Sequence, residues 1–323
     1  MRVRSGGAGR GPGSWARRTA VAAAVAGVAA AAVLLPSTAS ARPAPSAPAA
    51  APAPAWASRE AAAVHPGVGT TTQGGGTCTS NFVFRGGNGT VYLGQAAHCA
   101  GTGQSTETDG CTSATMPVGT AVTVRGERGF TVTGTMAYSS WVTMQRRGET
   151  DPNTCAYNDF ALVELPPEAV AATNPSVPWF GGPTGVSTAG LPEGAQAFSY
   201  GNSPVRGGVS ALSPKAGVSA GDVGDGWGHT VYTVSPGVPG DSGSGFLDSS
   251  GRAIGLLSTL NLAPLPVSNG VSDLSRMLAY ADTHGELGDL SLVDGTAPFT
   301  PTPPGVPTED LAPPAGPPVG AAS

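Results

Sequence analysis

The sequence is poor in charge, in aromatic side chains and above all in lysine. Of its 323 residues, 11% are charged and 6% are aromatic, and Lys215 is the single lysine. Five arginines and no acidic residue stand within residues 1–41, so without that segment the formal charge moves from −5 to about −10. An acidic chain of this kind offers no basic surface for a phosphate backbone, which argues against a nucleic-acid partner.

Long apolar runs are scarce as well. The one such run, residues 19–35, follows the five arginines and precedes Ala39-Ser40-Ala41, a small-residue cleavage pattern. It is too short and too rich in alanine for a membrane span. We therefore expect residues 1–41 to be a signal peptide for general secretion, and the mature protein to be extracellular and not bound to a membrane.

Cysteine is scarce and is not spaced for metal binding. The four cysteines are Cys78, Cys99, Cys111 and Cys155, with no Cys-x-x-Cys pair. In an exported chain four cysteines are expected to form two disulfides, for which three pairings are open at this point. Only His98 stands beside a cysteine, so we expect no metal site and no cofactor.

Helical periodicity is nearly absent between residues 67 and 288, where short β-like runs alternate with Gly, Ser, Asn and Pro. These runs are 81–84, 90–97, 121–124, 131–143, 160–165, 196–200, 229–235 and 253–258. Strands at this spacing predict an all-β barrel or sandwich. The exception is Ser272 to about Asp282, where apolar residues recur every three or four positions and predict one helix that packs on the second half.

Proline and alanine mark the boundaries of the predicted domain. Residues 42–64 and 294–323 contain little that can be buried, so we expect a disordered linker and a disordered tail. Residues 166–178 are the best candidate for a connection between two halves. The predicted domain thus spans 65–293, with one half at about 67–165 and the other at about 179–290.

The most informative stretch is Pro239 to Gly245, which places Ser242 in a glycine-rich turn. Glycine lets the backbone take positive φ and approach a ligand, so amides around Ser242 can point into one small space, as an oxyanion hole requires. A serine hydroxyl is a weak nucleophile at neutral pH, so catalysis also requires a base and a group that orients it. Gly-Asp-Ser-Gly is ordinary turn chemistry too, and this loop alone decides nothing.

His98 is the candidate base. It ends the strand-like run 90–97 and stands beside Cys99, so a strand and a disulfide can hold it in place. The other histidines lack this setting: His65 lies at the linker border, His229 starts a strand without a neighbouring cysteine, and His284 ends the predicted helix.

Asp159 is the candidate partner of the base, because a carboxylate that holds an imidazole tautomer has to be buried. It directly precedes the apolar run 160–165, which can bury it. Asp109 and Asp151 stand in loop sequence typical of solvated carboxylates. Asp241 is too close to the serine in the chain to reach the far side of the histidine.

Taken together, residues 95–99, 158–163 and 239–244 carry the order His, Asp, Ser, which differs from the order on other folds that use the same groups. In these motifs the sequence resembles the chymotrypsin-like (trypsin-fold) serine peptidases, and within them the small secreted bacterial members. The resemblance covers about residues 67–288. It implies two six-stranded antiparallel β-barrels with a C-terminal helix.

The resemblance also implies an activity, that of a monomeric serine endopeptidase, a hydrolase acting on proteins or peptides through an acyl-enzyme. Ser242 would attack the carbonyl, His98 would accept its proton, and Asp159 would stabilise the imidazolium. The amides of Gly240 and Ser242 would bind the oxyanion. Activity from neutral to alkaline pH is expected because the imidazole has to be unprotonated.

The same resemblance implies disulfides Cys78–Cys99 and Cys111–Cys155. It also indicates a substrate pocket. Trypsin-like members carry an aspartate six residues before the nucleophile, where this chain has Pro236, so no strict preference for Lys or Arg is expected. Ser258-Thr259-Leu260 resembles the strand that lines the pocket, with the leucine narrowing it toward small or apolar side chains.

One departure from the family concerns activation. Animal trypsins bury an Ile-Val-Gly-Gly-like terminus beside the aspartate that precedes the serine, and His65-Pro66-Gly67-Val68 does not supply that pattern. We therefore hypothesise that Asp241 meets an internal donor and that no activating cut is needed. Two other functions stay open, a serine esterase with the same residues and a non-catalytic secreted binding module.

Overall fold

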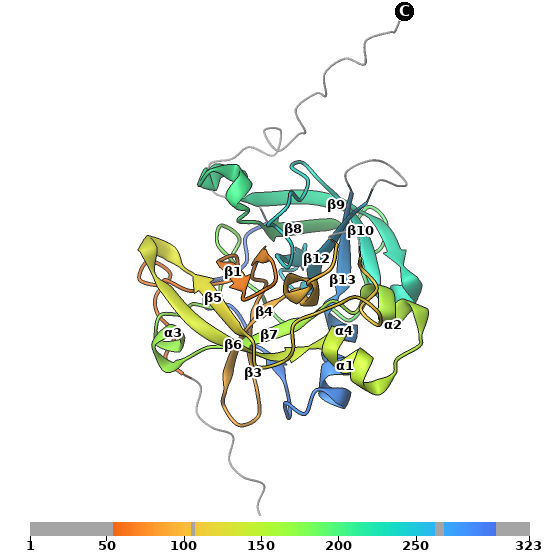
Figure 1. The fold of residues 1–323 in the computed structure, drawn as a ribbon. Coiled ribbons are helices and arrows are strands. Elements are labelled where there is room, and N and C mark those ends of the chain that lie inside the picture. Colours follow the sequence, from red (N-terminus) through yellow and green to blue (C-terminus); the bar gives the residue numbers. More distant parts are fainter. Residues whose placement is uncertain (1–53, 105–106, 262–267, 302–323) are drawn as a thin grey trace, which may run out of the picture. The chain divides into compact units, whose positions relative to one another are not determined.

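The computed structural model describes residues 54–104, 107–261 and 268–301. Their strands form two antiparallel units, an eight-stranded sheet and a closed six-stranded barrel, followed in the chain by a helix (Figure 1). The predicted all-β fold class with a C-terminal helix is confirmed; of the two six-stranded barrels that were expected, the second is closed, whereas the first is an eight-stranded sheet. No helix in the described ranges is long and apolar enough to cross a membrane. The signal peptide predicted over 1–41 lies outside the described residues.

The first unit has the strand order β14-β3-β4-β7-β6-β5-β1-β2. Its strands are β1 (Gly69–Thr72), β2 (Thr77–Thr79), β3 (Val83–Arg85), β4 (Val91–Gln95), β5 (Ala121–Arg125), β6 (Thr131–Ser139), β7 (Ala161–Glu164) and β14 (Ser291–Leu292). Six strands were expected, and the two extra ones are short edge strands of two and three residues. One of them, β14, comes from beyond the last helix and pairs with β3.

The second unit closes in the order β10-β13-β12-β11-β8-β9. Its strands are β8 (Gln196–Tyr200), β9 (Pro214–Val223), β10 (Gly228–Thr233), β11 (Gly245–Asp248), β12 (Ala253–Asn261) and β13 (Ser268–Asp273). Inward side chains such as Val231, Phe246 and Ile254 are fully buried and fill the barrel. This unit is therefore the six-stranded barrel that the sequence predicted.

In the part of the chain that the structure describes, four α-helices accompany the sheets: α1 (Ser140–Arg147), α2 (Pro152–Tyr157), α3 (Pro167–Ala171) and α4 (Leu274–His284). The predicted strand 131–143 was too long, because Ser139 caps a helix by accepting a hydrogen bond from the Val142 amide. Asp151, expected in a loop, likewise caps α2, with Pro152 at the first helical position. Such capping residues end a strand and begin a helix at positions where the apolar periodicity of the sequence does not indicate a helix.

Two segments predicted to be disordered are ordered in part. Residues 62–64 are buried, and the Ala57, Ala63 and Val64 amides donate to the carbonyls of residues 172 and 173. At the other end, the Phe299 ring packs on Phe198 at 5.6 Å between centroids. The described parts of both segments, 54–64 and 294–301, therefore belong to the folded domain, since short apolar side chains and backbone hydrogen bonds suffice to hold them. Residues 42–53 and 302–323 lie outside the described ranges.

The register of the first sheet positions its polar residues. Strands β4 and β7 pair antiparallel, with Gln95 opposite Ala161. The residues after β4 and the residues before β7 therefore lie at the same end of this strand pair. His98 follows the first strand and Asp159 precedes the second, so the pairing brings together two residues that are 61 positions apart.

A buried histidine joins three elements of the second unit. His229 on β10 is fully buried, and its Nδ1 lies 2.7 Å from Asp222 Oδ1 on β9. Its Nε2 lies 3.1 Å from Asp273 Oδ2, and Asp273 also caps α4 through the Arg276 amide. Burial lowers the pKa of His229, but the hydrogen bonds and charges of both aspartates outweigh it, so the pKa is raised. An imidazolium that donates from both nitrogens fits this site.

We expect His229→Gln to destabilise the protein by about 3 kcal/mol at pH 6, because it leaves Asp273 buried without its cation. A raised folded-state pKa means that the stabilisation is complete below the unfolded value of about 6.5 and is lost as the pH rises through the folded value. Denaturant unfolding at several pH values should therefore show the difference from wild type shrinking toward alkaline pH. His284→Gln, whose ring packs on Tyr280, is the control. A difference that grew with pH would contradict this assignment.

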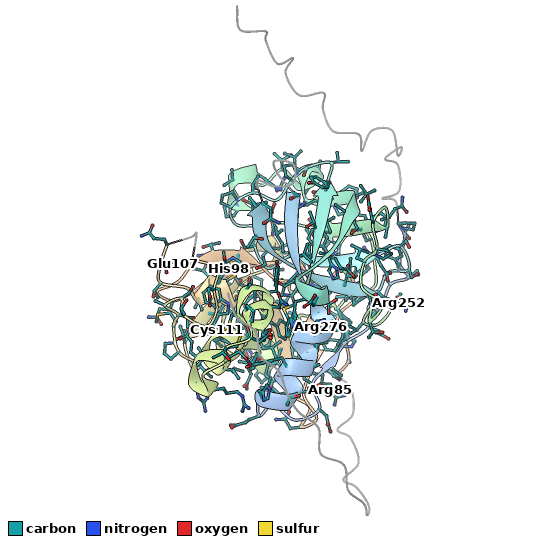
Figure 2. All side chains as sticks on the ribbon, turned by 90° about the vertical axis from the view of Figure 1, so that its right-hand side faces the viewer. Arg85, His98, Glu107, Cys111, Arg252 and Arg276 are labelled. Atoms are coloured by element: carbon teal, nitrogen blue, oxygen red, sulfur yellow. A yellow bond between two sulfur atoms is a disulfide. The ribbon has the colours of Figure 1, made fainter. Side chains whose placement is uncertain are left out.

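The turn between β9 and β10 connects the second unit to its neighbours. Arg276, labelled in Figure 2, donates from α4 to the carbonyls of Asp225 and Gly226. From the first unit, Asn153 Nδ2 on α2 donates to Asp225 Oδ2 at 3.1 Å. Because α2 leads directly to Asp159, these contacts tie the position of that carboxylate to the second barrel.

Candidate active site

His98 sits in a short 3₁₀ turn, Ala97–Ala100, directly after β4. The neighbouring Cys99 forms a disulfide with Cys78 at the end of the sheet, as expected. About a quarter of the His98 side chain is exposed (24%), whereas Asp159 is almost fully buried (4%). The strand, the turn and the disulfide thus hold the His98 imidazole so that one side contacts the buried Asp159 carboxylate and another side is open to solvent.

The Asp159 carboxylate accepts three hydrogen bonds. Its Oδ2 lies 2.6 Å from His98 Nδ1 and 2.6 Å from the Ser258 hydroxyl, which donates to it. Its Oδ1 accepts from the His98 backbone amide at 2.8 Å. This pattern fixes the imidazole ring and places the proton of the neutral ring on Nδ1, which leaves Nε2 as an acceptor.

Burial and the ion pair act in opposite directions on both members of this pair. Burial lowers the pKa of His98, but the charge and hydrogen bond of Asp159 raise it by more than burial lowers it, so the net shift is upward. Burial raises the pKa of Asp159, and the contacts with His98 and Ser258 outweigh it, so the net shift is downward. The carboxylate is therefore ionised, and the imidazole is a stronger base than a free one.

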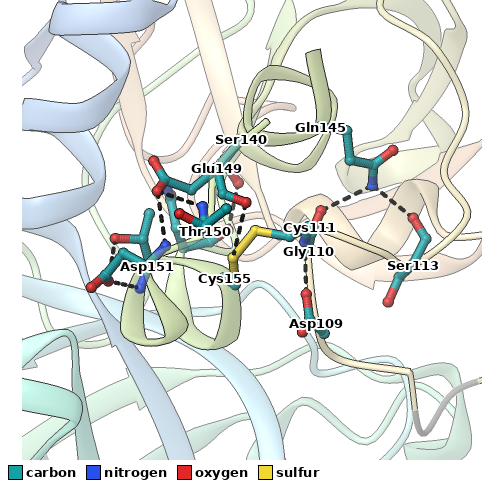
Figure 3. Close-up of a disulfide and its surroundings, with 12 residues drawn as sticks. Asp109, Gly110, Cys111, Ser113, Ser140, Gln145, Glu149, Thr150, Asp151 and Cys155 are labelled. Carbon is teal, nitrogen blue, oxygen red and sulfur yellow. Dashed lines mark hydrogen bonds between the residues drawn. A yellow bond between two sulfur atoms is a disulfide. The ribbon is translucent and has the colours of Figure 1, made fainter. Parts of the chain in front are cut away.

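The second expected disulfide, Cys111–Cys155, fixes the chain just before Asp159. Figure 3 shows how it joins α2 to the loop at Asp109, while Gln145 of α1 donates to the Gly110 and Ser113 carbonyls in that loop. Among the described residues, two groups of three lie close enough together to hold a metal ion. They are Cys78, His98 and Cys99, and Asp109, Cys111 and Cys155. Their sulfur atoms are bonded in disulfides, however, so they are not the thiolates that metals bind.

The Ser242 loop packs against the strand that leads to His98. Gly243 has φ of +87°, and a Cβ there would lie 2.6 Å from the Thr79 carbonyl oxygen and 2.9 Å from the Ala96 nitrogen. The Thr79 amide donates to the Ser242 carbonyl at 2.8 Å. Gly243, the residue after Ser242, thus contacts the backbone at Ala96, two residues before His98. The contact is so close that only glycine fits at position 243.

The polar atoms of Ser242 are left open. Its side chain is half-buried, and within the described ranges its hydroxyl makes no hydrogen bond. In the same ranges, neither the Gly240 nor the Ser242 amide donates to a protein acceptor, although the amides of Asp241, Gly243 and Ser244 all do. A hydroxyl and two amide donors without partners, together with a basic imidazole, are the groups that acyl transfer requires; within the described ranges no hydrogen bond joins Ser242 to His98.

Asp241 anchors the loop from the interior of the protein, where it is fully buried. Its Oδ2 lies 2.9 Å from Lys215 Nζ and 2.5 Å from Arg206 Nη2. The Val238 and Ser203 amides also donate to this carboxylate, each at 3.1 Å. The internal donor hypothesised for Asp241 is thus present. Sequence reasoning missed both cations, although a lone lysine within an uncharged stretch was a signal that could have found one of them.

The predicted pocket residues fall into two groups. Ser258 does not face a pocket, because its hydroxyl donates to Asp159. Leu260 does approach the opposite segment: its Cδ2 lies 3.1 Å from the position of a Cβ on Gly237, the residue after Pro236. Thr259 donates to Asn261 Oδ1 at 3.0 Å. Asn269, which sequence reasoning missed, holds the Gly237 segment by accepting its amide at 2.8 Å.

No protein-family model matches this sequence, and neither does any curated protein. Solved structures do resemble it. Protease A of Thermobifida fusca is 18% identical, with 72% of this chain and 100% of that chain covered and a TM-score of 0.44. A protease specific for glutamic acid is 17% identical, with 71% and 100% covered and a TM-score of 0.42.

The Nocardiopsis protease is 19% identical to this chain, with 71% of this chain and 99% of that chain covered and a TM-score of 0.39. At these identities and TM-scores the likeness concerns the fold alone, so any activity has to follow from the chain's own side chains. All three of these solved structures are proteases, and at TM-scores of 0.44 or less the likeness carries no conclusion about the family or activity of this chain.

Proposed function

We propose that this protein is a secreted serine endopeptidase in which Ser242 is the nucleophile, His98 the base and Asp159 the group that orients the base. The observation that carries the proposal is the His98 Nδ1 to Asp159 Oδ2 contact of 2.6 Å, made by a carboxylate that three donors hold in the interior. This contact leaves Nε2 free on an imidazole three residues beyond the end of β4, and the Ser242 loop packs against that end of the strand.

The chemistry follows in two balanced halves. As Ser242 Oγ bonds to the substrate carbonyl carbon, its proton moves to His98 Nε2, and the Gly240 and Ser242 amides stabilise the oxyanion. The imidazolium then gives that proton to the leaving amine as the C–N bond breaks, which leaves an acyl-enzyme. Water repeats the steps: its proton moves to Nε2 as it attacks, and that proton returns to Oγ as the acid leaves.

The free edge of β12 supports a peptide as the substrate. β11 pairs with β12 only as far as Leu256, and the Ser242 loop meets the strand at Leu257. Beyond that point, residues 258–260 have β13 on one side and no strand on the other within the described ranges. An extended peptide can add to such an edge as a further strand, which leads its backbone directly to Ser242.

A matched pair of substrates tests this function. The protein secreted from the full chain should hydrolyse a peptide of several residues at an internal amide, and shortening that peptide on the acyl side should reduce kcat/KM. The corresponding short ester serves as the comparison, because both substrates pass through the same kind of intermediate. Hydrolysis of the ester without cleavage of any peptide in a library would overturn the proposal in favour of an esterase.

For substrate preference we propose that Leu260 closes the pocket beside Ser242 to large side chains, since it reaches the Gly237 segment opposite. Cleavage is then expected after small residues such as Gly and Ala. Leu260→Ala should raise kcat/KM for Phe relative to Ala by about 10- to 100-fold, the range that pocket volume can supply. Leu212→Ala, at a similarly exposed leucine of the turn Ser210–Leu212, is the control. A wild type that already prefers Phe would contradict this assignment.

A further inference from the structure

The carboxylate beside the proposed nucleophile is shared by two cations. Lys215 comes from β9 and Arg206 from the loop after β8, and both contact the same oxygen, Asp241 Oδ2. The side chains of Lys215 and Asp241 are fully buried, and that of Arg206 is 9% exposed. The cluster therefore lies inside the protein, where solvent screens its charges very little.

The charges of this cluster do not balance. Among the described residues, Asp241 is the only carboxylate in an ion pair with either cation. Arg206 Nε is buried and has no hydrogen-bond partner among the described residues. Two positive charges thus face one negative charge. A buried charge without a counter-charge is costly, so the cluster favours any further negative charge that forms close to it.

Anchoring the loop does not require the second cation. Without Lys215, the Asp241 carboxylate would still accept from Arg206 and from the Val238 and Ser203 amides. An apolar side chain of similar length would fill the place of Lys215 inside the barrel at a lower cost of burial. The surplus charge therefore needs a reason other than the position of the loop.

The location of the cluster supplies that reason. Asp241 stands between Gly240 and Ser242, whose amides are free. We propose that Lys215 and Arg206 hold a surplus positive charge beneath these two amides, and that this charge stabilises the oxyanion formed when Ser242 attacks. The inference rests on the proposed function. Lys215 is then a positioning residue, which acts on the reaction through charge and does not touch the substrate.

The same geometry predicts a response to alkaline pH. The described charged groups that face the Lys215 ammonium are Asp241, which raises its pKa, and Arg206, which lowers it. Burial lowers it more, so the pKa of Lys215 falls below its ordinary value. When Lys215 loses its proton, the surplus charge disappears and the oxyanion loses part of its stabilisation. Turnover should therefore decline at a pH below that at which an ordinary lysine titrates.

The test measures an anionic mimic of the transition state. A peptide boronate forms a negatively charged tetrahedral adduct on a serine, whereas the matching peptide amide binds without that charge. In Lys215→Met, kcat and boronate affinity should each fall roughly 10-fold, while KM and affinity for the uncharged peptide stay constant. The alkaline decline of kcat should vanish in this variant, and Lys215→Arg should restore kcat and keep it constant to higher pH.

A second variant covers the case in which Lys215→Met does not fold. Arg206→Met removes the other cation from a surface loop, leaves Lys215 with Asp241, and should cause the same losses. Folded variants with wild-type kcat and boronate affinity would overturn the inference, as would a loss confined to KM. If the wild type neither hydrolyses peptides nor binds the boronate, the proposed function fails and the inference fails with it. If the wild type does both, the two variants test only the role of Lys215 and Arg206.

Discussion

Replacing Ser242 with alanine is expected to reduce kcat by about 10⁶, because it removes the hydroxyl that is proposed to form the acyl-enzyme. The fold should be unaffected, since the hydroxyl has no partner to lose within the described ranges. The measurement is kcat on a cleaved peptide, compared with wild type of equal thermal stability. Binding of the peptide should persist in the variant, because the free edge of β12 is unchanged.

Ser244→Ala is the matched control for this prediction. Ser244 belongs to the same loop, but its hydroxyl is buried and unpartnered. Its removal should leave kcat within a factor of about 3, as expected for a small change away from the reacting atoms. Equal losses in the two variants would mean that the loop, and not the Ser242 hydroxyl, is what matters.

Asp159→Asn is expected to reduce kcat by about 10⁴ while the protein stays folded. All three groups around Asp159 donate hydrogen bonds to it. An amide nitrogen cannot accept. In place of Oδ2 it deprives both the Ser258 hydroxyl and the His98 ring of their acceptor, and in place of Oδ1 it faces the donating His98 backbone amide. If the ring changes tautomer, its Nε2 carries the proton and can no longer take one from Ser242.

The pH profile of kcat and a variant of a second aspartate separate the loss of the Asp159 carboxylate from general damage to the fold. Asp151→Asn alters the cap of α2, close to Asp159 in the chain, and should change the free energy of unfolding only slightly, with little change in kcat, because asparagine also caps helices well. Wild-type kcat in Asp159→Asn would contradict the role assigned to the carboxylate. So would an equal fall in both variants, which would indicate a structural role for this segment.

The residues of the site could be predicted because each is marked by its own local sequence. His98 ends an apolar run beside a cysteine, Asp159 begins one, and Ser242 stands among glycines. The sequence does not state that His98 and Asp159 meet, which follows from the pairing of Gln95 with Ala161. The contact of Gly243 with Ala96 likewise brings the Ser242 loop to the strand that leads to His98, and both contacts are properties of the fold.

The parts that could not be predicted depend on partners far away in the chain. Lys215 and Arg206 give no sign in the sequence that both contact Asp241, 26 and 35 residues later. The strand that carries Lys215, Pro214–Val223, contains two glycines and a proline, so its β-propensity is low, and pairing with β8 and β10 decides its conformation. Helices α1 and α2 escaped prediction because caps, and not periodicity, define them.

The central claim is that Ser242 is an activated nucleophile, and covalent labelling tests it most directly. The secreted protein would be treated with a fluorophosphonate probe near pH 8, beside Ser242→Ala and His98→Ala, and the labelled peptide would be identified by mass spectrometry. The account predicts label on Ser242 in the wild type and essentially none in either variant. A folded wild type with both disulfides formed that takes up no label, or label that persists in Ser242→Ala, would contradict it.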